Sequence, residues 1–210
     1  MKKLTALFII AISIAFASCG EKVKELKEAG EAVQNLAEAA KTMEKSQEAV
    51  NAKLEDRKKR GDTLAMDYKK LQEFLPKSID GYTAGQPEGS AMNMQGASFS
   101  QAKIEFKKGN DVIEIELTDY NATIGLYQAA AAIFSMNITN DNKEYLEKTF
   151  DPQVPGAFAF EKFYKIDKRA ELTYAVGYRF ILSMHANNQT STDFLKKVAQ
   201  SMKLADLAKM

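Results

Sequence analysis

Residues 101–117 read QAKIEFKKGNDVIEIEL, and apolar side chains alternate with charged or polar ones in both halves of this stretch. A two-residue period is typical of a β-strand with one buried face. The four residues between the halves, Lys108 to Asp111, have the composition of a tight turn. The stretch therefore predicts an antiparallel hairpin. One face of it packs on a core, and the other carries Glu114 and Glu116 into water.

A second hairpin-like region lies further along the chain. Residues 157–166 and 171–184 flank a turn at Asp167-Lys168-Arg169, and the second arm contains the apolar run VGYRFILSM at 176–184. Residues 145–150 fit either a short strand or a helix. Residues 82–96 are rich in Gly, Ser, Asn and Met and predict a loop or an irregular edge strand, in which Met92 and Met94 share one face.

Helical periods occur between and after these strands. These periods predict helices around Leu64, Tyr68, Leu71 and Leu75, over residues 123–136, and after a capping box at Thr190 to Asp193. Strands in adjacent hairpins with helices interspersed favour an α+β fold. We expect a long N-terminal helix, followed by an antiparallel sheet with helices packed on one face.

The N-terminal segment differs in character from the rest of the chain. Lys2 and Lys3 precede an apolar run at residues 4–16, which is shorter than the roughly 20 residues of a spanning helix and suits a signal peptide. Ala15-Phe16-Ala17 fits an ordinary secretory cleavage site. Phe16-Ala17-Ser18-Cys19 resembles the lipobox of bacterial lipoproteins, with Phe16 standing where Leu is usual.

The resemblance to bacterial lipoproteins implies that residues 1–18 are removed and that Cys19 carries the lipid. Cys19 is the only cysteine, so it has no partner for an internal disulfide. Two or more acyl chains hold a protein stably on a membrane. Gly20, where an aspartate would favour inner-membrane retention, favours the outer membrane of the bacterial cell envelope. The alternative is a plain secreted protein with a free thiol.

Residues 19–61 are expected to form a lipid-anchored helical stalk. From Glu21 to Arg60 there is no proline and one glycine, and apolar residues recur at steps of three and four, as in a coiled coil. The basic run at 57–60, followed by Gly61, is interpreted as a solvated helix end rather than as a site for an anionic partner. Helix 21–60 is therefore predicted to self-associate weakly or to bind a protein partner.

Residues 62–210 are expected to form the globular domain. At its start, Asp62 or Thr63 is expected to cap the next helix. Asp62-Thr63-Leu64 also resembles acceptor sites for bacterial O-glycosylation, which makes Thr63 a candidate modification site. From residue 75 onward, Leu75-Pro76, residues 114–119 and residues 204–207 resemble envelope domains that have no agreed activity, so this resemblance implies no site.

Charge and motifs exclude several classes of function. The chain has 29 basic and 28 acidic residues, and loss of residues 1–18 leaves 27 and 28, a net charge of −1. This gives no electrostatic case for nucleic acid. Nucleotide-binding, redox and zinc-protease motifs are absent from the sequence, so no cofactor, metal or catalytic residue is assigned.

The sequence thus favours a non-catalytic envelope lipoprotein that acts as a membrane-anchored binding or structural module. One alternative is a small-molecule or lipid-binding module with a pocket lined by aromatic side chains, drawn from Phe158, Phe160, Phe163, Tyr164, Tyr174, Tyr178 and Phe180. A second is a hydrolase that uses His185, the only histidine, or the paired glutamates Glu114 and Glu116.

Overall fold

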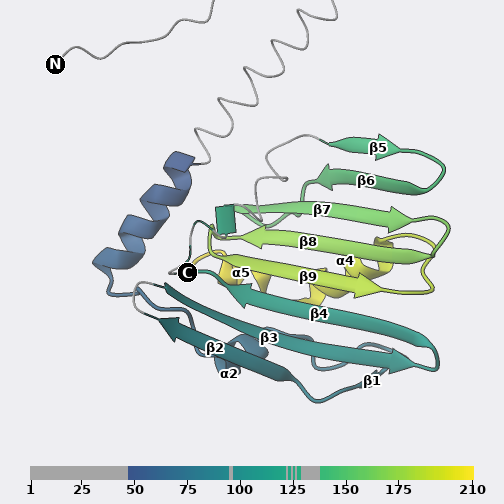
Figure 1. Ribbon diagram of the computed structural model, residues 1–210, viewed down its shortest axis with the longest axis horizontal. Coiled ribbons are helices and arrows are strands. Elements are labelled where there is room, and N and C mark those ends of the chain that lie inside the picture. Colours follow the sequence, from purple (N-terminus) through teal and green to yellow (C-terminus); the bar gives the residue numbers. More distant parts are fainter. Residues whose placement is uncertain (1–46, 95–96, 122, 124, 126, 129–137) are drawn as a thin grey trace, which may run out of the picture. The chain divides into compact units, whose positions relative to one another are not determined.

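The computed structural model describes residues 47–94, 97–121, 123, 125, 127–128 and 138–210 (Figure 1). The chain divides into two compact units, Met1–Ala40 and Lys41–Met210, and all described residues lie in the second. Cys19, the predicted signal peptide and most of the predicted stalk lie outside the described residues. So does most of the helix predicted at 123–136.

The described residues form an antiparallel sheet of nine strands with a few short helices, which confirms the predicted sheet but makes the fold mostly β. The strand order is β1-β3-β4-β9-β8-β7-β6-β5, and β2 also pairs with β3. The strands are β1 Thr83–Ala84, β2 Glu88–Met94, β3 Ala97–Lys108, β4 Asp111–Asp119, β5 Thr139–Asp141, β6 Tyr145–Phe150, β7 Ala157–Tyr164, β8 Arg169–Val176 and β9 Phe180–Ala186. The helices are α2 Tyr68–Gln72, α4 Asp193–Ser201 and α5 Leu204–Leu207.

The hairpin predicted at 101–117 is present as β3 and β4. Ile104 pairs with Ile115, and the two strands stay in register from Ser100 to the turn. Gly109 takes a φ of +59° in that turn, a conformation that glycine adopts without strain. The alternating apolar residues are all buried, whereas Glu114 and Glu116 lie on the opposite face.

The second hairpin region differs from its prediction, because residues 171–184 form two strands rather than one arm. Gly177 and Tyr178 take φ values of +62° and +55° and reverse the chain between β8 and β9. Val176 therefore pairs with Phe180 across this turn. Because β9 also pairs with β4, it joins the two hairpin regions into one sheet.

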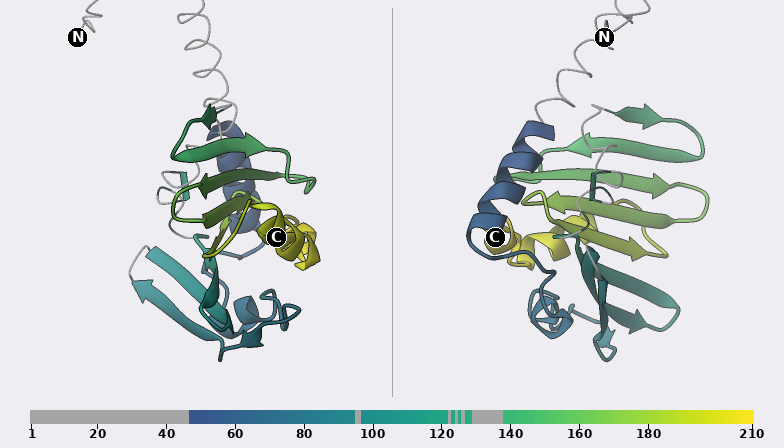
Figure 2. Two further views of the ribbon diagram at one scale, coloured as in Figure 1. Left: turned by 90° about the vertical axis from the view of Figure 1, so that its right-hand side faces the viewer. Right: turned by 60° about the vertical axis from the view of Figure 1, so that its left-hand side comes forward.

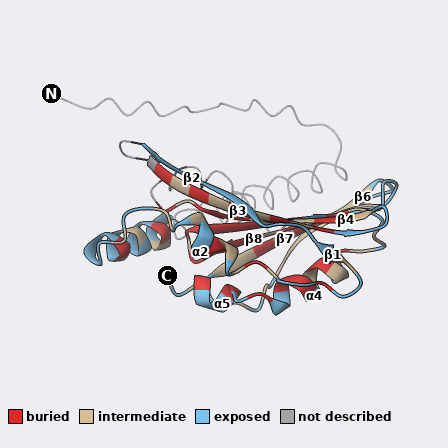
Figure 3. Cartoon of the chain, turned by 90° about the horizontal axis from the view of Figure 1, so that it is seen from below, coloured by how far each residue is buried: buried red, intermediate tan, exposed pale blue. Residues whose placement is uncertain are grey.

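One face of the sheet, the inner face, forms the main core. Figures 2 and 3 show α2, α4 and α5 on this side of the sheet. Their buried residues Leu71, Leu195 and Leu207 belong to the same cluster as the inner-face residues of the strands. These strand residues include Phe106, Ile115, Leu117, Leu172, Tyr174, Phe180, Leu182 and Met184, all almost fully buried.

A buried carboxylate anchors the start of α4 to the sheet. Glu161 lies on the inner face of β7 with 2% of its side chain exposed, and its Oε2 lies 2.8 Å from Lys196 Nζ. The hydroxyl of Thr192, the residue before α4, donates a hydrogen bond to the same oxygen. Lys148 Nζ lies 3.4 Å from Oε1. Helix α4 thus begins where its first turn can meet this charge.

The opposite face, the outer face, has a smaller apolar cluster at one end. Residues 47–59 are helical, and Val50 is 3% exposed where it packs with Tyr127, Ala175 and Ile181. Part of the predicted stalk therefore packs against the folded unit. In the described part of the chain, no helix is both long and apolar enough to cross a membrane.

Candidate functional site

A row of charged side chains crosses the outer face of the sheet. Six residues stand opposite one another on six neighbouring strands, each paired with the next in register. We call them the charged row: Glu105, Glu114, His185, Glu171, Lys162 and Glu147. Because neighbouring strands lie about 4.8 Å apart, the row extends over roughly 24 Å.

Ion pairs join members of the row to one another and to cationic side chains beside it. Lys162 Nζ lies 2.9 Å from Glu147 Oε2. Lys103 of β3 stands opposite Glu116, and its Nζ lies 3.0 Å from Oε2 of Glu114. At the start of β8, Arg169 Nε lies 3.2 Å from Glu171 Oε1. These groups are all partly exposed, so the row is accessible to a partner.

His185 stands in the middle of the row between two glutamates. Glu114 is its neighbour on β4 and Glu171 its neighbour on β8. His185 Nδ1 lies 3.8 Å from Glu171 Oε1, beyond hydrogen-bond distance but close enough for an ion pair. The Glu171 carboxylate raises the pKa of His185, and the imidazole lowers the pKa of Glu171.

Two tyrosines flank Lys162, the lysine of the row. Lys162 Nζ lies 4.3 Å from the ring centroid of Tyr145 and 5.1 Å from that of Tyr164. The guanidinium of Arg169 lies 4.0 Å from the centroid of Tyr164. These cation–π contacts fix long side chains that would otherwise be mobile. We call the charged row together with Lys103, Arg169, Tyr145 and Tyr164 the outer-face patch.

The surroundings of His185 do not resemble a nucleophile site. Ser183 lies two residues earlier on the same face of β9, whereas Nδ1 of the imidazole is directed to Glu171. His185 is 51% exposed. Among the residues that the structure describes, no group of three or more His, Cys, Asp or Glu could hold a metal ion.

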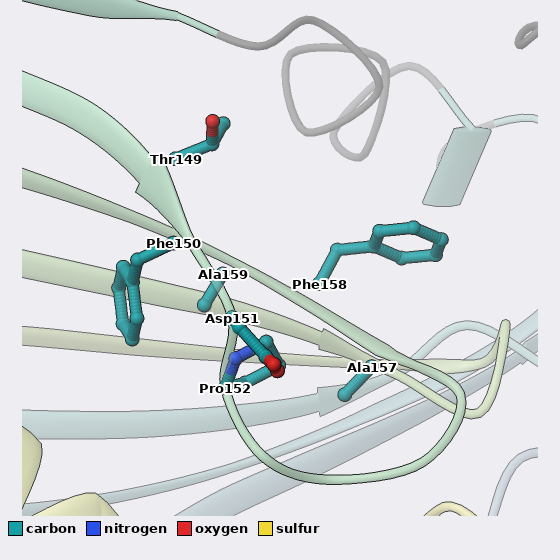
Figure 4. Close-up of a pocket in the computed structure, with 7 residues that line it drawn as sticks. All are labelled: Thr149, Phe150, Asp151, Pro152, Ala157, Phe158 and Ala159. Carbon is teal, nitrogen blue, oxygen red and sulfur yellow. The ribbon is translucent and has the colours of Figure 1, made fainter.

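The cavity in Figure 4 lies at the loop between β6 and β7. Its volume is about 460 Å³, and it is lined by Thr149, Phe150, Asp151, Pro152, Ala157, Phe158 and Ala159. Figure 4 shows the rings of Phe150 and Phe158 pointing to different sides of the chain. The strand register agrees, since Phe150 pairs with Ala159 on the inner face and Phe158 lies on the outer face.

The aromatic residues proposed as a pocket lining are divided in the same way. Phe163, Tyr174 and Phe180 belong to the inner-face core. Phe158, Phe160 and Tyr178 pack against the cluster around Val50 on the outer face. The structure therefore divides six of the seven residues between two groups on opposite sides of the sheet, and the seventh, Tyr164, contacts Lys162 and Arg169.

A buried polar network fastens residues 62–66 to the sheet. Arg179 binds Asp119 at two points, with Nε to Oδ1 at 2.9 Å and Nη2 to Oδ2 at 2.7 Å. Its Nη1 lies 2.6 Å from Asp62 Oδ2. Asn121 Nδ2 donates to the backbone oxygens of Asp62 and Leu64. We call Asp62, Asp119, Asn121 and Arg179 the polar clasp.

The expectation that Asp62 or Thr63 caps the next helix is wrong. The residue that caps α2 is Asp67, whose side chain accepts a hydrogen bond from the backbone N–H of Lys69 at 2.8 Å. Asp62 lies outside the cap position, because α2 begins only at Tyr68, and it forms a charge-assisted contact with Arg179.

Arg57 also departs from its sequence interpretation as part of a solvated helix end. It is fully buried, and its two terminal nitrogens donate to the carbonyl oxygens of Gly177 and Tyr178 at 3.4 and 3.3 Å. Burial and the nearby Arg179 lower the pKa of Arg57. The spacing Val50, Leu54, Arg57 is one helical stripe, and this was the signal that Arg57 faces the domain.

The remaining predicted residues stand as follows. Cys19 lies outside the described residues, so its lipidation stays a prediction. Thr63 is exposed immediately after the clasp residue Asp62, and its glycosylation also stays a prediction. Met92 and Met94 do share one face of a strand, where they are 42% and 64% exposed.

Comparisons with known proteins give no family. No protein-family model matches the chain, and no curated protein sequence matches it. The X-ray structure of an uncharacterised protein from Mycobacterium smegmatis is similar at a TM-score of 0.34 and 6% identity, covering 64% of this chain and 94% of the other.

Proposed function

We propose that this chain is a bacterial envelope lipoprotein anchored through Cys19, and that its folded part is a non-catalytic binding module. The proposed docking surface is the outer-face patch. The observation that carries the proposal is the charged row, in which six in-register groups cross six strands on an open face. Residues 1–20, with their signal-peptide pattern and single cysteine, support the anchor.

The ion pairs of the row contribute little to folding. Exposed pairs are typically worth about 0–1 kcal/mol, since water and salt screen them. Stability therefore does not require six such groups to be aligned across the sheet. Arranged charges of both signs instead give specificity and faster association with a complementary surface.

The balance of charge favours a protein partner. From Glu114 to Glu147, acidic and basic groups alternate along the row, and the neighbouring Lys103 and Arg169 add two more cations. Such a mosaic complements another mosaic, whereas a polyanion is bound by a surface of one sign. The flat rings of Tyr145 and Tyr164 add rigid contact area of the kind enriched at protein interfaces.

A charge swap tests the docking surface without removing an ion pair. Lys103→Glu combined with Glu114→Lys exchanges the partners of a 3.0 Å pair whose side chains are 38% and 43% exposed. The matched control exchanges Lys58 and Glu55, a 2.8 Å pair with 52% and 60% exposure. Intact protein captured from membranes should lose its bound partner with the first swap only. Equal capture by both swapped proteins would disprove the docking surface.

The anchor is tested separately. Cys19→Ala removes the only thiol, so the variant should move from the membrane fraction to the soluble envelope fraction. Labelling with a radioactive fatty acid should mark the protein that retains Cys19 and not the Cys19→Ala variant. The anchor is contradicted if the variant stays in membranes or if the protein that retains Cys19 takes up no label. Neither result bears on the proposed docking surface.

A further inference from the structure

One edge of the sheet is open at β2. Among the strands that the structure describes, β2 pairs only with β3. All of its residues, Glu88–Met94, are exposed. Figure 1 shows β2 at one end of the sheet, away from β4 to β9. A strand in this position presents unpaired backbone N–H and C=O groups to any strand that approaches.

The usual protection of an edge stops where β2 begins. Ala84 of β1 pairs with Phe106, and Glu88 of β2 pairs with Lys103, so residues 85–87 stand against only two residues of β3. This extra residue and Pro87 interrupt the edge before β2. From Glu88 to Met94 the register then continues without a bulge or a proline.

The open edge also lacks charge beyond its first residue, Glu88. No charged residue occurs from Gly89 to Ala102, in a chain in which 27% of residues are charged. Met92 and Met94 are two of the four exposed large hydrophobic residues within the described ranges. Natural edges are normally kept apart by lysines or other charges, so this edge is permissive for pairing.

The strand is held in a fixed conformation. Ser98 of β3 accepts a hydrogen bond from the backbone N–H of Ala65 at 2.9 Å and donates one to the side chain of Asn93. Tyr68 packs against Gly89 so closely that a Cβ there would lie 2.4 Å from its ring. An edge already held in place loses little conformational entropy when it pairs.

We propose that β2 pairs with β2 of a second copy of this chain. The two strands run antiparallel about a two-fold axis at Ala91, which places Glu88 of one copy opposite Met94 of the other. The two Glu88 carboxylates then lie about 20 Å apart, at opposite ends of the paired strands. The edge is self-complementary because no like charges meet, and this favours a second copy over a foreign strand.

This contact is small. A single strand pairing buries less than the about 1,200 Å² of stable complexes, so the dimer is expected to be concentration-dependent. Confinement to a membrane surface raises the effective concentration of the two copies. The pairing depends on the edge alone and not on the outer-face patch.

A cysteine on the two-fold axis tests the pairing. Directly opposed residues have Cα atoms about 4.5–5.5 Å apart, which suits a disulfide. Ala91→Cys in the full chain, oxidised mildly in native membranes, should therefore give a disulfide-linked dimer. The matched control is Ile166→Cys, at a residue that is 74% exposed and far from β2 along the sheet. The chain without an introduced cysteine shows whether Cys19 itself forms a disulfide-linked dimer.

A charge on the edge supplies the second test. Met92→Lys in the Ala91→Cys chain should lower the disulfide-linked fraction at least about tenfold, because a charged edge resists pairing. Ile166→Lys in the same chain should leave it unchanged. Equal cross-linking at residues 91 and 166, no effect of Met92→Lys, or a disulfide from residue 91 to a different protein would overturn the proposal.

Discussion

Arg179 and Asp119 form a two-point ion pair that is almost completely buried, with side-chain exposures of 3% and 0%. The pair joins the end of β4 to the turn before β9, and through Asp62 it also fixes the chain segment that precedes α2. Three separate parts of the sequence thus depend on one guanidinium.

Removal of Arg179 should be strongly destabilising. Arg179→Leu leaves Asp119 buried without its charge partner, so the free energy of unfolding should fall by about 3–5 kcal/mol. Arg179→Lys keeps the charge but loses the planar fork, and it should cost less. Urea unfolding followed by circular dichroism measures both. Arg60→Leu, which breaks an exposed pair with Asp56, is the control and should change stability by less than about 1 kcal/mol.

The charged row should make stability depend on pH. Because the pKa of His185 is raised in the folded state, its contribution is fully present below the ordinary histidine value of about 6.5 and is lost as pH rises through the folded value. The pKa of Glu171 is lowered, so its contribution is lost as pH falls through the folded value. The wild-type protein should therefore exceed His185→Gln in free energy of unfolding by the largest amount near about pH 5–6.

The same pair can be followed directly. His185 is the only histidine, so its imidazole resonance is unambiguous in an NMR titration. The midpoint should lie above about 6.5 and should move down in Glu171→Gln, since the carboxylate favours the charged imidazole. An unchanged midpoint in Glu171→Gln would show that the 3.8 Å pair does not act on His185.

Gly177 should tolerate no side chain. Its φ is +62°, and a Cβ would lie 3.1 Å from Ala208 Cα and from the Leu207 carbonyl oxygen, which are backbone atoms that cannot easily move. Gly177→Ala should lower the free energy of unfolding by about 2–3 kcal/mol. Gly109→Ala is the matched control, because its φ is +59° but no atom lies within 4 Å of the added Cβ. It should cost only about 1 kcal/mol.

Glu161→Gln should loosen the start of α4. The amide can still accept from Thr192, but the charge that attracts Lys196 and Lys148 is lost. We expect a loss of about 1–3 kcal/mol and faster hydrogen exchange in the first turn of α4. Asp193→Asn, where the carboxylate is 74% exposed and 3.8 Å from Lys196 Nζ, should show neither effect.

Some of this fold could be predicted from residue patterns. Alternation over residues 102–107 and again over 113–117 identified β3, β4 and the side of each strand that is buried, because burial of one face fixes the register. The second hairpin region was harder. Gly177 and Tyr178 lie inside an apolar run, and a turn that bears a tyrosine at positive φ has no strong sequence signal.

The candidate site could be predicted only in part. Glu114 and Glu116 were expected on a wet face, and they are there. Their alignment with His185, Glu171 and Lys162 depends on which strands become neighbours, and sequence periodicity carries no information about strand order. The burial of Arg179 was missed for a related reason, since a buried arginine has the same identity as an exposed one until its partners are known. For Arg57, the helical stripe with Val50 and Leu54 was an available signal that was not used.

The charged row also constrains how a gene for this fold can drift. Along β4, β9 and β8 its members alternate with core residues, so the loss of one codon inside any of these strands would turn charged or polar side chains into the core and apolar ones into water. Changes of length within these strands are therefore expected in pairs of codons. Single-codon changes should accumulate in turns such as Lys108 to Asp111, where no alternation has to be kept.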